Sequence, residues 1–143
     1  MKKLYAVATM AVLLCLAGFV MPVTTFAQQC VDNGDGTVTD NSTGLMWQKA
    51  TAGPMNWNTA MNYASSLSLG GHSGWRLPSR DELHGLYRSP CTNMMNVESS
   101  RYWSSTTSAS YRTVAWLIKF YNGHMDTCNK SSTYYVRAVR AGQ

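Results

Sequence analysis

The sequence has 143 residues, of which 45% are hydrophobic and 13% are charged, with 11 Gly and 4 Pro. This composition excludes a disordered polymer, which would be poorer in apolar residues, and a collagen-like fibre, which would be far richer in Gly and Pro. The 12 basic and 7 acidic residues give a formal net charge of +5, but they form none of the dense basic clusters typical of nucleic-acid-binding proteins, so we expect no nucleic acid partner.

Residues 1–27 have the order of a secretory signal peptide. Lys2 and Lys3 precede an uncharged apolar run over 4–20, and small residues follow at Thr25 and Ala27. An uncleaved membrane anchor is the alternative, because the run is at the lower limit for spanning a bilayer. We predict a signal peptide over 1–27 and one mature domain over 28–143, secreted or periplasmic and free of the membrane after cleavage. Without the two lysines the formal charge falls from +5 to +3.

Cleavage would leave three cysteines in the mature chain, Cys30, Cys91 and Cys128. An odd number in an oxidising compartment predicts one disulfide and one leftover thiol, and three pairings are open. We favour a disulfide between Cys91 and Cys128, since Cys30 would lie near a mobile N-terminus. A zinc site is disfavoured because the His residues are scattered, so we expect no metal and no cofactor.

The first part of the mature chain predicts β-structure. Strands on either side of the Gly-rich turn 32–36 form a hairpin, a second turn follows at 40–44, and the apolar run 45–47 predicts a third strand. The Asp residues of the first turn also suggest a calcium site. We favour a structural turn, because Asn-Gly and Asp-Gly pairs already suit a hairpin and the spacing of an EF-hand is absent.

Two helices are predicted next. Apolar residues recur at helical spacing over 57–67, with Asn56 as the N-cap and the glycines at 70–71 as the end of the helix. The second helix begins after Ser79, which forms an S-x-x-E capping box with Glu82, and it ends before Pro90. The polar segment 92–100 is predicted to be a loop.

The last third of the chain returns to β-structure. A strand begins at 102–103, apolar residues alternate over 114–121, and Asn122-Gly123 predicts a type I′ hairpin turn before a terminal strand over 134–140. The order is strands, two helices, strands. This order predicts an α+β fold, a mostly antiparallel sheet with two helices.

Five blocks occur in an order that resembles the Lcl C-terminal-domain family, named for the terminal domain of a bacterial collagen-like adhesin. They are residues 32–40, 43–48, 69–78, 102–105 and 135–140. The resemblance implies an exported bacterial module with a C-type-lectin-like fold, and glycosaminoglycan binding and adhesion as attributed to the namesake. This sequence has no collagen repeats and none of the Glu-Pro-Asn, Gln-Pro-Asp or Trp-Asn-Asp triplets used for calcium-dependent sugar binding, so that sugar site is not carried over.

Several arginines are expected to be structural. Arg76 lies just before the second helix, whose first turn contains Asp81 and Glu82, so an ion pair there would fix the loop to the helix. We prefer this interpretation to a ligand contact. Arg137 and Arg140 on the terminal strand are expected to have structural roles as well.

The segment 99–113 is the best candidate for a ligand-binding surface, because tyrosines offer stacking faces and cations attract sulfate or phosphate groups. The candidate residues are Arg101, Tyr102, Tyr111, Arg112, Lys119 and Lys130. Burial of Tyr102 in the core, with a merely solvated loop, is the alternative. No Gly-x-Ser-x-Gly elbow or phosphate loop is present, so we expect no enzymatic activity.

Export together with such a surface predicts a secreted, non-enzymatic ligand-binding module, adhering to anionic or sulfated glycans, with an anionic polysaccharide or a surface protein as partner. The alternative is a structural or assembly subunit of a cell-envelope complex. Such a subunit would form homo-oligomers through exposed strands, with Cys30 as an intermolecular link.

Overall fold

The computed structural model describes residues 28–142, so the predicted signal peptide lies outside the described residues. The strands are β1 (Cys30–Asp32), β2 (Thr37–Asp40), β3 (Leu45–Gln48), β4 (Ala52–Met55), β5 (Arg101–Thr107), β6 (Val114–Lys119), β7 (Met125–Asn129), β8 (Tyr134–Val136) and β9 (Val139–Ala141). The helices are α2 (Trp57–Ser66), α3 (Arg80–Tyr87) and the short 3-10 helix η1 (Pro90–Met94). The predicted α+β class with two α-helices is confirmed for the described part of the chain.

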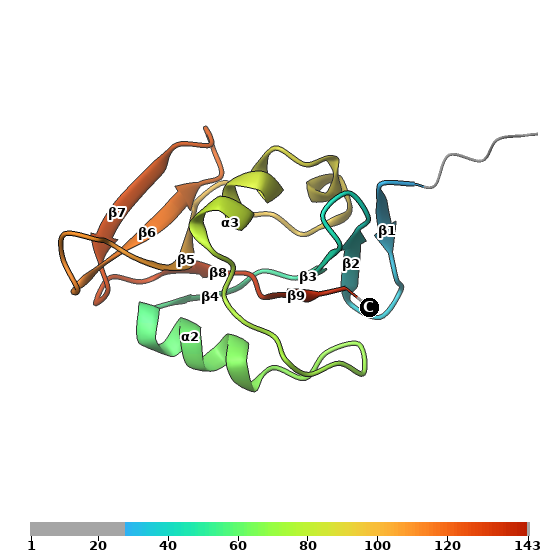
Figure 1. Ribbon diagram of the computed structural model, residues 1–143, viewed down its shortest axis with the longest axis horizontal. Coiled ribbons are helices and arrows are strands. Elements are labelled where there is room, and N and C mark those ends of the chain that lie inside the picture. Colours follow the sequence, from blue (N-terminus) through green and yellow to red (C-terminus); the bar gives the residue numbers. More distant parts are fainter. Residues whose placement is uncertain (1–27, 143) are drawn as a thin grey trace, which may run out of the picture.

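The strands form two sheets, with the orders β1-β2-β3-β9 and β4-β8-β5-β6-β7. Every pairing is antiparallel except that of β5 with β8, which confirms a mostly antiparallel architecture. Figure 1 shows α3 above the strands and α2 below them. The likeness to C-type lectins remains a prediction.

The four-stranded sheet contains the first and the last strand of the described chain as its two edges. Its register pairs Cys30 with Asp40, Asp40 with Leu45, and Leu45 with Ala141. The first residue of β1 and the last residue of β9 therefore lie in one row across the sheet.

The core consists of two hydrophobic clusters on opposite faces of β5 and β6. Tyr102 and Ile118 belong to the cluster that contains Leu83 of α3, whereas Trp103 and Leu117 belong to the cluster on the α2 side. Successive residues of a strand point to opposite faces, so coverage of both faces buries every one of these side chains. Burying a side chain of this size contributes about 1.5–3 kcal/mol.

Helix α2 begins as predicted and ends earlier than predicted. The Asn56 side chain accepts a hydrogen bond from the backbone N–H of Thr59, as an N-cap does. The helix ends at Ser66, and the backbone of the C-cap residue Leu67 is already extended. Gly70 and Gly71 instead have positive φ angles of 61° and 76° and lie in a tight turn between Leu69 and His72. The glycines therefore serve this turn and not the helix end.

The predicted type I′ turn between β6 and β7 is wrong. That turn needs positive φ at both central residues, but only Gly123 has it, at 79°. The last ladder pair is Ile118 with Met125, so the connection is longer than two residues. A Cβ atom at Gly123 would lie 2.3 Å from Cε1 of Tyr87. The glycine thus allows this connection to pack closely against α3.

The single terminal strand predicted over 134–140 is divided in two. Residues 134–136 form β8 of the five-stranded sheet and 139–141 form β9 of the four-stranded sheet. Arg137 and Ala138 lie between the two strands and are both fully buried. This short crossing links the two sheets.

The predicted disulfide between Cys91 and Cys128 is wrong, because the structure pairs Cys30 with Cys91 and leaves Cys128 as a free thiol. Cys30 begins β1 and is only 6% exposed, so it does not belong to a mobile terminus. Cys91 lies in the cluster on the α3 side, whereas Cys128 packs against the other cluster. The central sheet therefore separates Cys91 from Cys128.

Candidate functional site

The predicted ligand-binding role of Tyr102 is wrong because its side chain is completely buried. Its hydroxyl lies 2.6 Å from Oγ1 of Thr51 and accepts a hydrogen bond from the backbone N–H of Glu98. A ring with no exposed surface offers no stacking face to a ligand. Tyr102 instead joins two loops to the centre of the sheet.

The five other predicted residues do not form one patch. Arg101 pairs directly with Lys119 at one end of the β5–β6 hairpin, whereas Tyr111 and Arg112 lie in the loop at its other end. The seven residues of β5 span about 20 Å at roughly 3.3 Å per residue. The expectation of a single surface is therefore wrong, and the hairpin divides the cations into two groups.

The end with Arg101 and Lys119 has a mixed charge. Nζ of Lys119 lies 3.1 Å from Asp126, and the guanidinium of Arg101 lies 5.8 Å from the ring centre of Tyr134. The neighbouring Tyr121 raises the pKa of Arg101. One carboxylate thus offsets one of the two cations at this end.

The free thiol of Cys128 contacts Tyr134, although the Cys128 backbone pairs with Ala115 nearer the other end of the hairpin. Its sulfur is 3.1 Å from the hydroxyl of Tyr134 and 3.5 Å from that of Ser132. Burial raises the pKa of Cys128, but hydrogen bonds with Ser132 and Tyr134 and the charge of Arg101 lower it by more, so the pKa lies below its ordinary value.

The other end carries aromatic and basic groups, of which Tyr111 and Arg112 are exposed and Trp57 and Lys130 are half-buried. We call the residues Tyr111, Arg112, Lys130 and Trp57 the hairpin-tip surface. Tyr111 is 68% exposed and Arg112 beside it is exposed. Nζ of Lys130 lies 3.9 Å above the ring of Trp57, and the backbone N–H of Lys130 donates to the carbonyl of Thr113. Figure 1 shows this loop at the end of the molecule farthest from the C-terminus.

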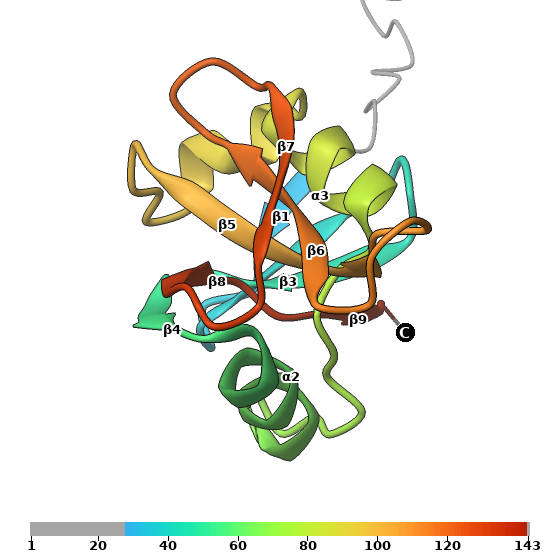
Figure 2. The same ribbon diagram turned by 90° about the vertical axis from the view of Figure 1, so that its left-hand side faces the viewer.

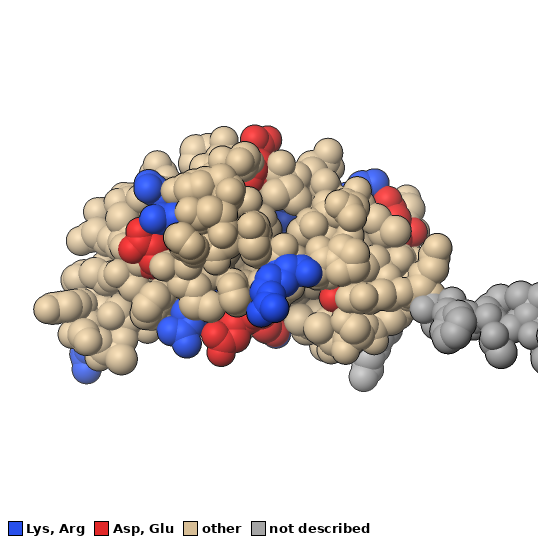
Figure 3. Space-filling model, turned by 90° about the horizontal axis from the view of Figure 1, so that it is seen from above, with Lys and Arg blue, Asp and Glu red and all other residues tan. Residues whose placement is uncertain are grey.

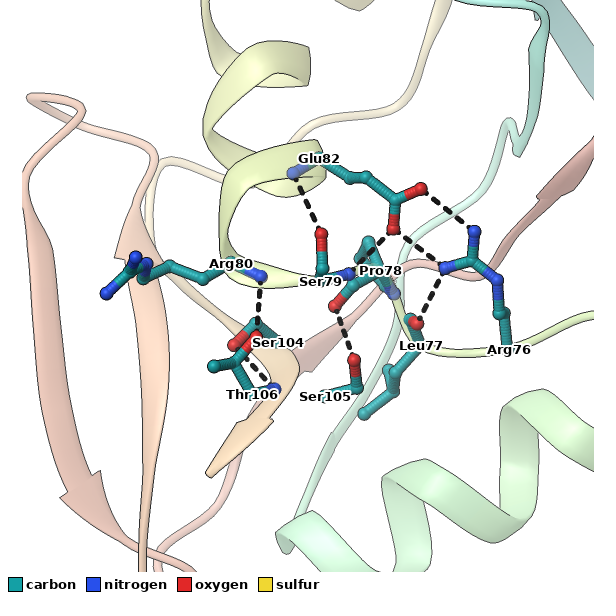
Figure 4. Close-up of polar contacts among 9 residues, drawn as sticks. All are labelled: Arg76, Leu77, Pro78, Ser79, Arg80, Glu82, Ser104, Ser105 and Thr106. Atoms are coloured by element: carbon teal, nitrogen blue, oxygen red, sulfur yellow. Dashed lines mark hydrogen bonds and ion pairs between the residues drawn. The ribbon is translucent and has the colours of Figure 1, made fainter. Parts of the chain in front are cut away.

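The predicted ion pair of Arg76 is confirmed, with Glu82 as the partner. The guanidinium donates two hydrogen bonds of 2.7 and 2.8 Å to the two carboxylate oxygens, as Figure 4 shows. Glu82 also accepts from the backbone N–H of Ser79, and its own backbone N–H donates to the Ser79 hydroxyl. The predicted capping box is therefore confirmed as well. Asp81 pairs instead with Arg80, at 3.3 Å.

Two of the blocks that carry the family resemblance meet at this corner (Figure 4). The carbonyl of Pro78 accepts hydrogen bonds from the backbone N–H and the hydroxyl of Ser105. The backbone N–H of Arg80 donates to Oγ1 of Thr106, at 2.9 Å. Blocks 69–78 and 102–105 thus fix the start of α3 to β5, which gives these residues a structural role.

Lowering the pH should test the contacts of Glu82 with Arg76 and Ser79. Hydrogen bonding to Arg76 and to Ser79 lowers the pKa of Glu82, while partial burial opposes the shift. Its stabilising effect is therefore complete above the ordinary Glu pKa of about 4.3 and is lost as the pH falls through the lower folded value. As the pH is lowered from 7, we expect the midpoint of urea unfolding to fall more steeply for the native protein than for Glu82→Gln. Parallel pH profiles would contradict this role.

Arg137 is a fully buried cation held by neutral acceptors. Its guanidinium donates to the backbone carbonyls of Gln48, Lys49 and Asn96 and to the hydroxyl of Thr51. Arg140 donates to the carbonyl of Ser73, at 2.9 Å. The expected structural roles are confirmed, but sequence reasoning missed that Arg137 is the centre of a buried network.

The Asp-rich turn uses its carboxylates within the hairpin. Asp32 accepts hydrogen bonds from the backbone of Gly34 and from Nζ of Lys49, and Asp35 accepts from the backbone and hydroxyl of Thr37. These bonds lower the pKa of both carboxyl groups. Among residues 28–142, no group of three or more His, Cys, Asp or Glu side chains is arranged to hold a metal ion. The contacts match the structural interpretation of this turn.

The geometry defines a small α+β domain built from the sequence blocks noted above, with an exposed tyrosine and arginine and a half-buried lysine and tryptophan at one end of a hairpin. Comparison with protein-family models matches residues 36–140 to the Lcl C-terminal domain. The chain belongs to the Lcl C-terminal domain family, a family of domains associated with bacterial adhesins. No curated protein matches the chain. Within the described part of the chain, no helix is both long enough and apolar enough to cross a membrane.

Proposed function

We propose that this protein is an exported, non-enzymatic binding module that adheres to a sulfated glycan through the hairpin-tip surface. The observation that carries the proposal is the exposed ring of Tyr111 beside Arg112, with the Lys130–Trp57 pair at the same end of the hairpin. Membership of an adhesin-associated family supports a role in attachment.

The chemistry of these side chains suits a sulfated sugar. Tyr111 offers a flat amphipathic face to a sugar ring, and the forked guanidinium of Arg112 matches the oxygens of a sulfate group. Figure 3 shows that the face on the α3 side has basic and acidic groups interspersed among uncharged ones. A long anionic polymer would meet carboxylates on that face, which favours the hairpin tip as the contact.

Heparin affinity measured against salt concentration tests this proposal. We expect heparin to bind at low ionic strength and to be released as salt rises, because exposed charges are screened. Replacing both Arg112→Ala and Lys130→Gln should weaken binding about tenfold or more, from the loss of two charge-assisted contacts. The matched control neutralises Arg101 and Lys119 at the other end and should retain most of the affinity. Absence of binding, or dependence on the control pair alone, would overturn the proposal.

Assembly into a cell-envelope complex is the second candidate function. Cys128, and not the predicted Cys30, is the free thiol, and it lies on β7 at the edge of the five-stranded sheet. An edge strand has backbone groups free to pair with another chain. Light scattering and non-reducing gels would detect a Cys128-linked dimer, and a monomer at high concentration without reducing agent would argue against assembly.

A further inference from the structure

A groove of about 670 Å³ lies between α3 and the turn that joins β2 to β3. Figures 1 and 2 both show this turn beside the α3 segment. The volume lies within the usual range of small-molecule sites, about 300–1,000 Å³. None of the residues of the hairpin-tip surface lines the groove, so it would be a separate site.

The charges around the groove largely cancel. Among the acidic residues that line it, Glu82 pairs with Arg76 and Asp81 pairs with Arg80. Asp40 and Arg88 remain on the lining, with opposite charges. An anion in the groove would therefore face Asp40 and a cation would face Arg88. This balance favours an uncharged ligand.

Hydrogen-bonding groups of both kinds line the same groove. Asp40 is only 3% exposed, and its carboxylate accepts from the backbone and hydroxyl of Ser42 and from the hydroxyl of Ser89. Asp40 is therefore occupied within the fold, and the exposed Ser42 beside it offers a hydroxyl oxygen as the acceptor. The guanidinium of Arg88 is exposed and has no side-chain hydrogen bond within residues 28–142. A sugar hydroxyl both donates and accepts, so it can pair with either group.

Apolar residues line another part of the groove, and its space is open at Gly85. Leu45 and Leu86 contribute apolar surface, and a Cβ atom built at Gly85 meets nothing within 4 Å. The C–H face of a sugar ring can pack on such a surface. The indole N–H of Trp47 has no acceptor among the described residues, but its nitrogen has less than 1 Å² of exposed surface, so a ligand would not reach it directly.

We propose that this groove binds a neutral, hydroxyl-rich ligand, one or two sugar units of an uncharged glycan. The exposed hydroxyl of Ser42 would accept from a sugar hydroxyl, Arg88 would donate to another, and the half-buried Leu45 would pack against the ring. Binding here would be independent of the sulfated ligand at the hairpin tip and largely insensitive to salt, because the ligand carries no net charge.

Chemical-shift mapping of the ¹⁵N-labelled protein tests the groove. The probes are maltose, lactose, cellobiose and chitobiose, with a heparin-derived disaccharide for comparison. We expect at least one neutral disaccharide to cause saturable shifts in the amides of Ser42, Gly85 and Ser89, at low and high salt alike. Gly85→Leu should weaken this binding about tenfold or more, because it fills the groove, while the Arg112→Ala and Lys130→Gln pair should leave it unchanged.

Other results would overturn the groove proposal. These are the absence of groove shifts with all four neutral probes, groove shifts with the sulfated probe alone, and full binding by Gly85→Leu. If Gly85→Leu fails to fold, Arg88→Ala with Ser42→Ala removes two polar partners from the groove and should also weaken binding about tenfold. The heparin affinity of the same variants distinguishes failure here from failure at the hairpin tip.

Discussion

Replacing Arg137 with Ala should lower the free energy of unfolding by about 3–5 kcal/mol. The guanidinium is fully buried and donates to three backbone carbonyls and one hydroxyl. Its removal leaves those buried acceptors without a donor and creates a cavity, and both effects destabilise. Urea unfolding followed by tryptophan fluorescence would measure the change.

A matched arginine on the same segment provides the control. Arg140 is partly exposed and makes one side-chain hydrogen bond, to the carbonyl of Ser73, so Arg140→Ala should cost about 1 kcal/mol. Arg137→Lys should also be strongly destabilising, because an ammonium group lacks the planar fork that reaches several acceptors at once. Equal losses for Arg137→Ala and Arg140→Ala would contradict the assigned role of the buried network.

Removing the Cys30–Cys91 disulfide should cost about 4 kcal/mol. The two cysteines are separated by 61 residues, and a cross-link of this span restricts the unfolded chain by roughly that free energy at 25 °C. Comparing urea unfolding of the native protein with that of the Cys30→Ala, Cys91→Ala variant would measure the difference. Part of the loss would come from the buried sulfur atoms, because both residues belong to the core.

Cys128 is the control for this measurement. It is free and only partly buried, so Cys128→Ala should change the free energy of unfolding by less than about 1 kcal/mol. Reducing agent should destabilise the native protein and the Cys128→Ala variant equally. Protection from reducing agent in Cys128→Ala would instead indicate a disulfide that involves Cys128.

Local sequence patterns predicted the helices well. The capping box of Ser79 and Glu82 depends on residues three apart, and the start of α2 depends on the Asn56 side chain and the next turn. Strand β4 was missed because its sequence, Ala-Gly-Pro-Met, contains residues that are depleted in strands. The helix η1 was missed because it begins at Pro90 and lies in a polar segment that has no helical period.

The errors that affect the candidate site concern contacts between distant segments. The choice among three disulfides depended on which face of a sheet each cysteine occupies, and spacing carries no information on that. Tyr102 looked like a surface residue because the burial of both faces of β5 arises only when α2 and α3 pack on opposite sides. The groove beside α3 was missed because its lining residues, among them Asp40 and Arg88, come from distant parts of the sequence and lie around one groove only in the folded chain.

The arrangement of the four-stranded sheet has a consequence for how the domain can be displayed. Because Cys30 and Ala141 lie in one row, on the two edge strands of this sheet, the chain enters and leaves the fold at the same end of the molecule (Figure 1). The hairpin tip lies at the opposite end of the molecule. A tether joined to either terminus would therefore lie at the opposite end of the domain from Tyr111 and Arg112. It would leave both residues accessible to a ligand.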